Sequence, residues 1–274
     1  MKQAVEAANA VSRRDRVRAA TTREIKQVAR RILVEQGPDS VSLRAIAREM
    51  GMTAPALYRY FGSHEELLRN VIGDIYLEIT SDIQAAIDAA ADDGSGAKLM
   101  AAAREFRTWS LGHKREFGLL FGAPLPGLDL NHTDIADECG QKFSGTFLAL
   151  YIELWNNRPF PVLAPEEIDP GLRSQLERYR ESAGANGLFL QAAAAALPVG
   201  AVLSFVYCWV RLYGMVSLEV FGHLGWVLDD SGPMFEMMLT ELLPVLGLDG
   251  LGSPGGGPTR ARRGRNPIRR GQGP

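Results

Sequence analysis

The stretch of sequence that decides the fold is residues 43–62, LRAIAREMGMTAPALYRYFG. It contains two short segments with helical spacing of apolar residues, separated by Gly51. A small residue, Ala47, lies four positions before this glycine, and an apolar residue, Leu57, follows it. A helix-turn-helix unit needs a small residue where its helices meet, a turn residue that accepts a positive φ, and an apolar anchor on the second helix. The spacing therefore predicts a helix-turn-helix whose second helix faces the major groove of DNA.

Capping residues on both sides of this unit predict the starts of further helices. A Ser or Thr followed three residues later by Glu forms a capping box, and this pattern occurs at Thr21 and at Ser63. We therefore expect one helix from Thr21 to Gly37 and a long helix from Ser63 to the DDGSG stretch at residues 92–96. Ser42 and Thr53 are the expected N-caps of the two short helices.

The rest of the chain is also predicted to be helical, because apolar residues recur at helical spacing and strand-like alternation is nearly absent. The expected helices cover residues 99–109, 115–121, 134–156, 170–183, 198–224 and 233–246. From residue 252 onward, 17 of the 23 residues are Gly, Pro or Arg, so we expect no fixed structure there. The predicted fold class is all-α.

The formal net charge of −2 hides an uneven distribution along the chain. Residues 1–70 contain 13 Lys/Arg and 8 Asp/Glu, whereas residues 71–251 contain 11 and 24. The last 23 residues contain 6 Arg and no acidic residue. A basic head, an acidic body and a basic tail indicate different roles for the three parts.

Enzymatic and metal-binding classes find little support in the residues. The two cysteines, Cys139 and Cys208, are too few for a disulfide framework, and the four histidines have no metal-ligand spacing. No phosphate-binding loop, dinucleotide-binding motif or nucleophile elbow is present. We therefore expect no catalytic residue, no metal site and no cofactor.

Residues 187–210 contain no charged residue over 24 positions, which is long enough for a membrane span. Gln191, Pro198 and Gly200 interrupt this run, and no cluster of basic or aromatic residues flanks it. We expect a buried helix or a subunit interface here rather than a membrane segment. The polar N-terminus resembles no secretory signal, so we expect a cytoplasmic protein.

The run from Thr22 to Leu68 resembles the DNA-binding domain of the tetracycline-repressor (TetR) family of bacterial transcription regulators. The matching features are the leading amphipathic helix, Ile46-Ala47, Gly51, LYRYF at residues 57–61 and SHEEL at residues 63–67. The downstream region is similar to the regulatory domain of one subgroup, through Trp109, FGLLFG at residues 117–122, and the stretch from Trp209 to Gly222-His223. The resemblance implies an N-terminal three-helix DNA-binding domain that a long helix joins to a helical ligand-binding and dimerisation domain. The corresponding boundaries are a flexible arm at 1–20, the DNA-binding domain at 21–70, the regulatory domain at 71–250 and a disordered tail at 251–274.

The resemblance also implies which residues contact double-stranded DNA. Ser42 and Arg44 match positions that contact the DNA backbone or a neighbouring base. Thr53, Ala54, Pro55 and Ala56 match the groove-facing start of the recognition helix. Tyr58 and Tyr60 match the aromatic residues that contact phosphates. With Arg59 and His64 added, the expected set is Ser42, Arg44, Thr53, Ala54, Pro55, Ala56, Tyr58, Arg59, Tyr60 and His64. The family commonly has Lys where this chain has His64, so that contact is expected to be weaker or dependent on pH. Because the groove-facing residues are small and apolar, base reading would rely on thymine methyl groups and on Arg44 or Arg59.

Simpler roles remain open for several of these residues. Tyr58 and Tyr60 could merely cover the core, and Arg59 could be a solvated charge. The basic arm (Arg13, Arg14, Arg16 and Arg18) and the arginines at 260–270 could follow DNA phosphates or only increase solubility.

For the body, the resemblance implies a small-molecule pocket and a homodimer formed by the last two helices. Aromatic residues on the helices that usually line a pocket are Phe106, Trp109, Phe117, Phe121, Phe147, Tyr151 and Trp155, with His113, Arg104 and Glu219 as polar candidates. The candidates for the dimer interface are Phe205, Trp209, Leu212, Val216, Phe235, Met238 and Leu242. Both sets could instead be ordinary core.

The predicted function is a dimeric, sequence-specific transcription regulator that represses until a small-molecule ligand, whose identity the residues do not give, releases it from its operator. The alternative is a helical protein-interaction module in which the helix-turn-helix is only structural.

Overall fold

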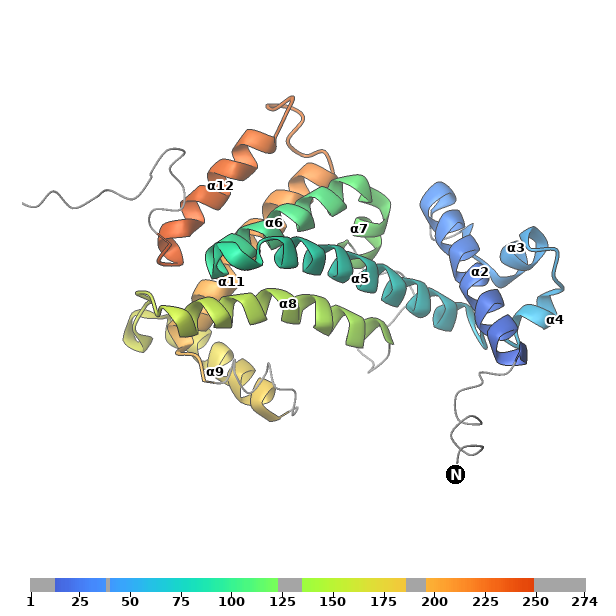
Figure 1. Cartoon of the computed structure of the whole chain (residues 1–274), viewed down its shortest axis with the longest axis horizontal. Helices are drawn as coiled ribbons and strands as arrows, with labels where there is room; N and C mark the ends of the chain where they lie inside the picture. Colours follow the sequence, from blue (N-terminus) through green and yellow to red (C-terminus); the bar gives the residue numbers. More distant parts are fainter. Residues whose placement is uncertain (1–12, 38–39, 123–134, 186–195, 249–274) are drawn as a thin grey trace, which may run out of the picture.

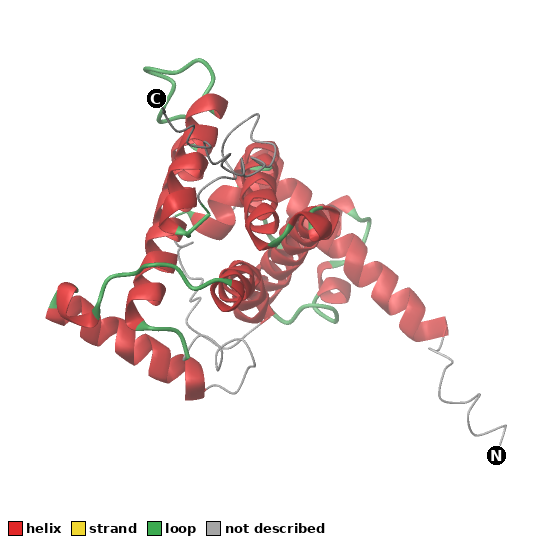
Figure 2. Cartoon of the chain, turned by 60° about the vertical axis from the view of Figure 1, so that its left-hand side comes forward, coloured by secondary structure: helices red, strands yellow, loops and turns green. Residues whose placement is uncertain are grey.

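The computed structural model describes residues 13–37, 40–122, 135–185 and 196–248. Figure 1 shows a small cluster of helices, α2 to α4, at one end of a long helix, with the remaining helices gathered around its other end. Regular structure in the described parts of the chain consists of helices alone, drawn red in Figure 2. The predicted all-α fold is therefore confirmed.

The first described helix, α2, covers Arg13–Gln36 and starts earlier than expected. The hydroxyl groups of Thr21 and Thr22 donate to the carbonyl oxygens of Val17 and Arg18, one turn back, at 3.0 and 2.9 Å. Thr21 is thus inside the helix, and the prediction that the helix begins there is wrong. Residues 13–20 were expected in a flexible arm but continue the first helix, while residues 1–12 lie outside the described part.

The three helices that follow begin where the capping residues predict. Ser42 accepts a hydrogen bond from the Ala45 amide at 3.1 Å and begins α3, Leu43–Glu49. Ser63 accepts one from the Glu66 amide at 3.1 Å and begins α5, His64–Ala89. Between them, Thr53 precedes the four-residue α4, Ala54–Leu57, but its side chain makes no capping bond.

The body begins after a 3-10 turn at Ala91–Asp93, and a second such turn, Pro165–Glu167, precedes α9. Its helices are α6 (Ser95–Gly112), α7 (Lys114–Phe121), α8 (Ile135–Asn157), α9 (Pro170–Ala185), α11 (Val199–Val220) and α12 (Gly232–Val245). Each expected helix is present with ends shifted by a few residues, as is usual for boundaries read from sequence. The tail at residues 251–274 lies outside the described residues.

The long helix α5 joins the two parts of the molecule (Figure 1). One face of it carries Ile75, Ile79 and Ile83, all fully buried, against the neighbouring helices. The buried cluster that contains them extends from Ile25 on α2 to Phe235 on α12. The cluster of helices α2 to α4 and the body therefore share a continuous hydrophobic core.

Helix α11 contains most of the described part of the uncharged run. Within the described residues it is the one helix that is long and apolar enough to cross a membrane, and half of its most apolar window is buried inside the fold. A Cβ atom at Gly200 would clash with the carbonyl oxygen of Leu163, so the start of α11 packs directly against the chain that follows α8. This contact fits the expected buried helix.

Candidate nucleic-acid interface and regulatory site

The helix-turn-helix has the geometry that its sequence predicts. Gly51 has a φ of +64°, and the Met52 amide donates to the Ala47 carbonyl oxygen at 2.8 Å, which closes the turn. Ala47 and Leu57 are buried, at 2% and 0% exposed, where α3 and α4 meet the rest of the core. The three requirements on a small residue, a turn residue and an anchor are thus confirmed.

The expected DNA-contacting residues surround this buried anchor on the outer side of the head. Six of them are exposed, namely Ser42, Arg44, Thr53, Pro55, Tyr58 and Arg59. Ala54, Ala56, Tyr60 and His64 are half-buried. Figure 1 places α3 and α4 at the end of the molecule opposite α12, where a duplex could approach without meeting the acidic body.

The two tyrosines differ in their surroundings. Tyr58 is 53% exposed, whereas Tyr60 packs against the hydrophobic core. The Arg18 guanidinium lies over the Tyr60 ring, 5.4 Å from its centroid, and donates to the Arg59 carbonyl oxygen at 3.1 Å. Arg18 therefore fixes the chain just after α4. Sequence reasoning missed this contact because Arg18 was placed in a flexible arm.

His64 departs from the expected role in this conformation. Its Nε2 atom is buried and has no hydrogen-bond partner among the described residues. This nitrogen cannot reach a phosphate unless the side chain turns, so a His64 contact to DNA would use the other ring nitrogen or another rotamer.

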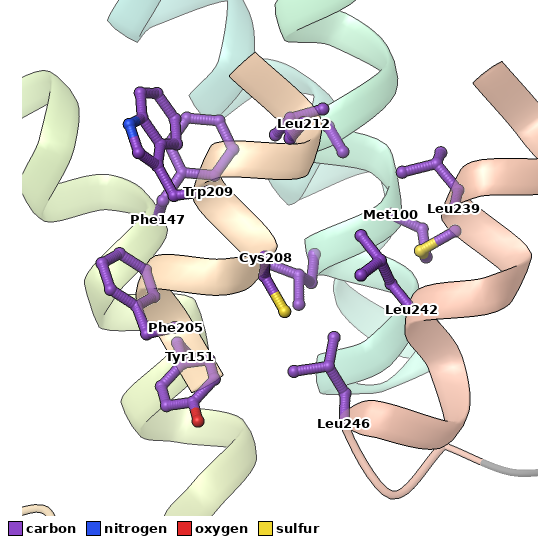
Figure 3. A pocket seen from close by; sticks show the side chains of 12 residues that line it. Met100, Phe147, Tyr151, Phe205, Cys208, Trp209, Leu212, Leu239, Leu242 and Leu246 are labelled. Carbon is purple, nitrogen blue, oxygen red and sulfur yellow. The ribbon is translucent and has the colours of Figure 1, made fainter. Parts of the chain in front are cut away.

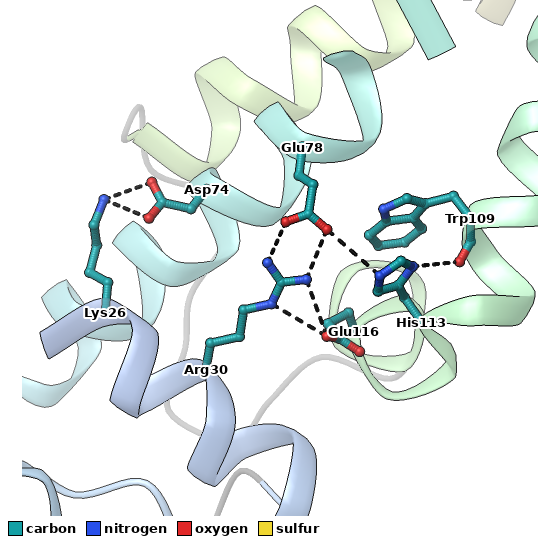
Figure 4. Close-up of polar contacts among 7 residues, drawn as sticks. All are labelled: Lys26, Arg30, Asp74, Glu78, Trp109, His113 and Glu116. Atoms are coloured by element: carbon teal, nitrogen blue, oxygen red, sulfur yellow. Dashed lines mark hydrogen bonds and ion pairs between the residues drawn. The ribbon is translucent and has the colours of Figure 1, made fainter. Parts of the chain in front are cut away.

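A polar link joins the head to the body around Arg30 of α2 (Figure 4). Its guanidinium donates to Glu78 on α5 at 3.0 Å and to Glu116 on α7 at 3.2 Å. The Glu116 side chain is only 8% exposed. The hydrogen bonds from Arg30 hold the pKa of Glu78 below its usual value, against the opposing effect of burial. One cation thus satisfies two carboxylates from two different helices of the body.

Further contacts reinforce this link. Lys26 of α2 donates to Asp74 of α5 at 2.7 Å, and Arg115 of α7 donates to the Val34 carbonyl oxygen of α2. The His113 ring stacks on Trp109 at 4.7 Å between centroids, and its Nε2 lies 3.8 Å from the nearer Glu78 oxygen. A movement of α7 would therefore shift α2, the first helix of the head.

A small cavity lies deeper in the body, between α6, α8, α11 and α12 (Figure 3). Of the seven aromatic residues predicted to line a pocket, Phe147 and Tyr151 line this one. Phe106 and Phe117 are fully buried core residues, and Trp109 belongs to the link around Arg30.

The other two predicted pocket residues lie elsewhere. Phe121 lines a separate hollow with Tyr76 and Phe143, and Trp155 packs edge-on against Phe160. The predicted polar candidates do not line the cavity either. Arg104 pairs with Glu236, Glu219 pairs with Arg107, and His113 stacks on Trp109.

The predicted dimer-interface residues face inward. Phe205, Trp209, Leu212 and Leu242 line the cavity. Val216 and Phe235 are fully buried, and Met238 packs against the same core. These residues pack inside the subunit. The geometry therefore does not favour them as the dimer interface.

The opposite faces of the same two helices carry exposed apolar side chains that the sequence reasoning missed. They are Val206, Tyr207, Val210 and Leu218 on α11 and Met234, Met237 and Val245 on α12. We call this set the outer apolar face. Both helices are apolar around most of their circumference, so the sequence offered no signal that separates the outer face from the inner one.

Within the described residues, no group of three or more His, Cys, Asp or Glu side chains is placed to hold a metal ion.

Comparison with known proteins matches both parts of the chain. Residues 25–71 match the family model of bacterial regulatory proteins, tetR family, and residues 99–242 match that of the tetracyclin repressor-like C-terminal domain. The chain is 29% identical over 239 residues to the HTH-type transcriptional regulators Rv1816 of Mycobacterium tuberculosis and Mb1846 of Mycobacterium bovis. Each of these alignments covers 86% of this chain and 96% of the relative.

Two solved structures extend the comparison. The crystal structure of the regulatory protein SCO4313 is 28% identical, has a TM-score of 0.64, and is matched over 85% of this chain and 100% of its own. A protein of unknown function from Rhodococcus sp. RHA1 shares the fold at 19% identity and a TM-score of 0.51, over 82% of this chain and 93% of its own.

Proposed function

The chain belongs to the TetR family of bacterial regulatory proteins and is a DNA-binding transcriptional regulator, and on this premise we propose that it is a homodimeric repressor that a small molecule releases from its operator. The observation that carries this proposal is that Thr53, Pro55, Tyr58 and Arg59 are exposed around the buried anchor Leu57. Such an arrangement presents the start of α4 to base edges while the core stays closed. A cytoplasmic location, where the chain meets DNA, follows from this role.

We assign the DNA contacts residue by residue. Thr53, Ala54, Pro55 and Ala56 face the groove, where their small side chains fit against thymine methyl groups. Ser42, Tyr58 and Tyr60 contact the backbone, and Arg44 and Arg59 supply charge near the bases or phosphates. Arg18 adds a supporting role, because it stabilises the chain after α4 through the Arg59 carbonyl group.

The outer apolar face is the observation that supports the proposed dimer. It places seven exposed apolar side chains on two neighbouring helices, a larger group than scattered surface residues usually form. Pairing this face with the same face of a second copy gives a closed two-fold interface. Two heads related in this way read two half-sites about 34 Å apart, or a small multiple of that distance.

The link around Arg30 supports a route from ligand to DNA. It connects the head to α5 and α7, and both of these helices pack into the body that contains the cavity. A ligand shifts the two heads only to the extent that it binds the two settings of the body with different affinities.

Selection from a random pool of duplexes with the purified full chain tests the proposal. We expect a two-fold symmetric site, bound at least about 10³ times more tightly than unrelated DNA at the same salt concentration. The affinity should fall steeply with salt, by a slope of about −0.9 for each phosphate contact. Equal affinity for every duplex would overturn the proposal.

A further inference from the structure

We propose that the cavity behind α12 binds an uncharged, apolar small molecule. This inference rests on the proposed function, because it names the chemical class of ligand to which the regulator responds. It is carried by the chemistry of the lining, by the small size of the cavity and by the position of α12 between the cavity and the outer apolar face.

The lining comes from four helices that are distant in the sequence. Ala103 of α6, Phe147 of α8, Cys208 of α11 and Leu242 of α12 contribute to it. Figure 3 shows the Cys208 sulfur directed into the space between α11 and α12, with leucines of α12 facing it. A molecule in this space would contact both helices that carry the outer apolar face.

Among the described residues, no charged side chain lines the cavity. The Tyr151 hydroxyl group already donates to the Ala201 carbonyl oxygen at 2.8 Å, and burial raises the pKa of Cys208 to about 11, so its thiol stays neutral at pH 7. A carboxylate or an ammonium group entering this space would lose its hydration and meet no opposite charge, which is unfavourable. The chemistry of the lining therefore selects uncharged molecules.

Three arginines of the body, on α6 and α11, are already paired with glutamates. Arg107 donates to Glu219 at 2.7 Å, Arg104 to Glu236 at 2.8 Å and Arg211 to Glu241 at 2.7 Å. An anionic ligand would have to break one of these ion pairs to gain a partner. This arrangement strengthens the selection against anions.

The cavity is also small, with a volume of about 50 Å³. Since one water molecule takes about 30 Å³ in the liquid, a ligand with a ring or a chain needs more room than the cavity offers. The α12 wall has Leu239 and Leu242 on the cavity side, with Met237 exposed on its other side. Accommodating a ligand therefore displaces α12, and with it the outer apolar face.

Toluene and benzoate form a matched pair of probes, because they share the ring and differ by a methyl group in place of a carboxylate. Titration calorimetry and thermal unfolding of the full chain should show saturable binding of toluene and an increase in Tm. Benzoate at the same concentrations should do neither. Benzoate binding as tightly as toluene would overturn the proposal.

Variants locate the site. Ala103→Val adds two methyl groups inside the cavity and should weaken toluene binding about tenfold or more. Ala101→Val makes the same change on α6 at a residue outside the lining, and it should bind toluene like the wild type. Equal toluene affinity in these two variants would also overturn the proposal.

Leu242→Ala enlarges the cavity and should strengthen toluene binding, the opposite direction, so the test does not depend on Ala103→Val folding. An unchanged or lower affinity in Leu242→Ala counts against the site.

Operator binding by the ligand-free protein separates this inference from the proposed function. If the protein binds an operator specifically but does not prefer toluene to benzoate, the cavity assignment fails while the proposed function stands. If toluene binds selectively and no duplex does, the proposed function fails while the cavity keeps its ligand class.

Discussion

The guanidinium of Arg30 donates to Glu116, 86 residues further along the chain, at 3.2 Å. Glu116 is nearly buried, and among the described residues Arg30 is its recorded ion-pair partner. The head is thereby attached to α7 by a contact that also includes Glu78.

Arg30→Ala should lower the free energy of unfolding by about 2–3 kcal/mol, because it leaves the buried Glu116 carboxylate without its cation. Arg31→Ala is the matched control, since Arg31 is the more exposed neighbour and pairs with Glu35 and Glu49, neither of which is buried. We expect it to cost less than about 1 kcal/mol. Urea unfolding of the three proteins measures both values, and equal losses would contradict a special role for Arg30.

The contribution of Glu78 to stability should depend on pH. Its pKa is depressed in the folded state by Arg30, so its stabilising effect is present above the unfolded pKa of about 4.3 and is lost as the pH falls through the folded pKa. The stability difference between the wild type and Glu78→Gln should therefore be largest near neutral pH and shrink below about pH 4. Unfolding titrations between neutral and acidic pH measure this difference. A difference that grows on acidification would show that the sign is wrong.

Tyr58→Ala should weaken binding to operator and to random duplexes alike, by about five- to tenfold, because the phosphate contact proposed for Tyr58 carries no sequence information. The free energy of unfolding of the Tyr58→Ala protein should differ from that of the wild type by less than about 0.5 kcal/mol, since the Tyr58 side chain is mostly exposed. Tyr60→Ala should reduce stability as well, because Tyr60 packs on the core and under Arg18. Fluorescence anisotropy and thermal unfolding separate the two effects. Loss of binding to the operator alone would instead assign Tyr58 to base reading.

Met237→Asp should dissociate the proposed dimer without unfolding the subunit, because Met237 is 65% exposed on the outer apolar face. Leu77→Asp is the control, since Leu77 is an exposed apolar residue on α5, away from that face. Sedimentation velocity should find monomers for the first variant and dimers for the second. A dimeric Met237→Asp protein would place the interface elsewhere.

Gly51→Ala should lower the free energy of unfolding by about 1–2 kcal/mol, because a side chain at a φ of +64° is strained even where there is space. Gly112→Ala provides the comparison, since a Cβ there also meets nothing within 4 Å but the backbone is not in the left-handed region. That variant should be neutral or slightly more stable. Equal destabilisation by both would show that φ is not the cause.

The helix-turn-helix was predictable because its determinants lie within a few residues of each other. Ala47, Gly51 and Leu57 each act locally, and the caps Ser42 and Ser63 fix the helix starts on either side. The same local rule failed at Thr21, where a capping-box sequence lies inside a helix that continues upstream.

The cavity and the outer apolar face could not be predicted in this way. Helices α11 and α12 are apolar on nearly all sides, so helical spacing does not decide whether Leu242 or Met237 faces the core. The contact between Arg30 and Glu116 depends on how α2 and α7 pack, and no short-range pattern encodes it.

Arg18 has a further consequence for protein engineering. It lies seven residues before the family match begins, yet its guanidinium supports the backbone at the end of the DNA-reading unit. A chimeric regulator that borrows this head from residue 21 onward would leave that support behind, although every residue facing the groove would be present. When heads are exchanged between regulators, the chain should therefore be cut before Arg13, so that the transplanted head keeps the contact between Arg18 and the Arg59 carbonyl oxygen.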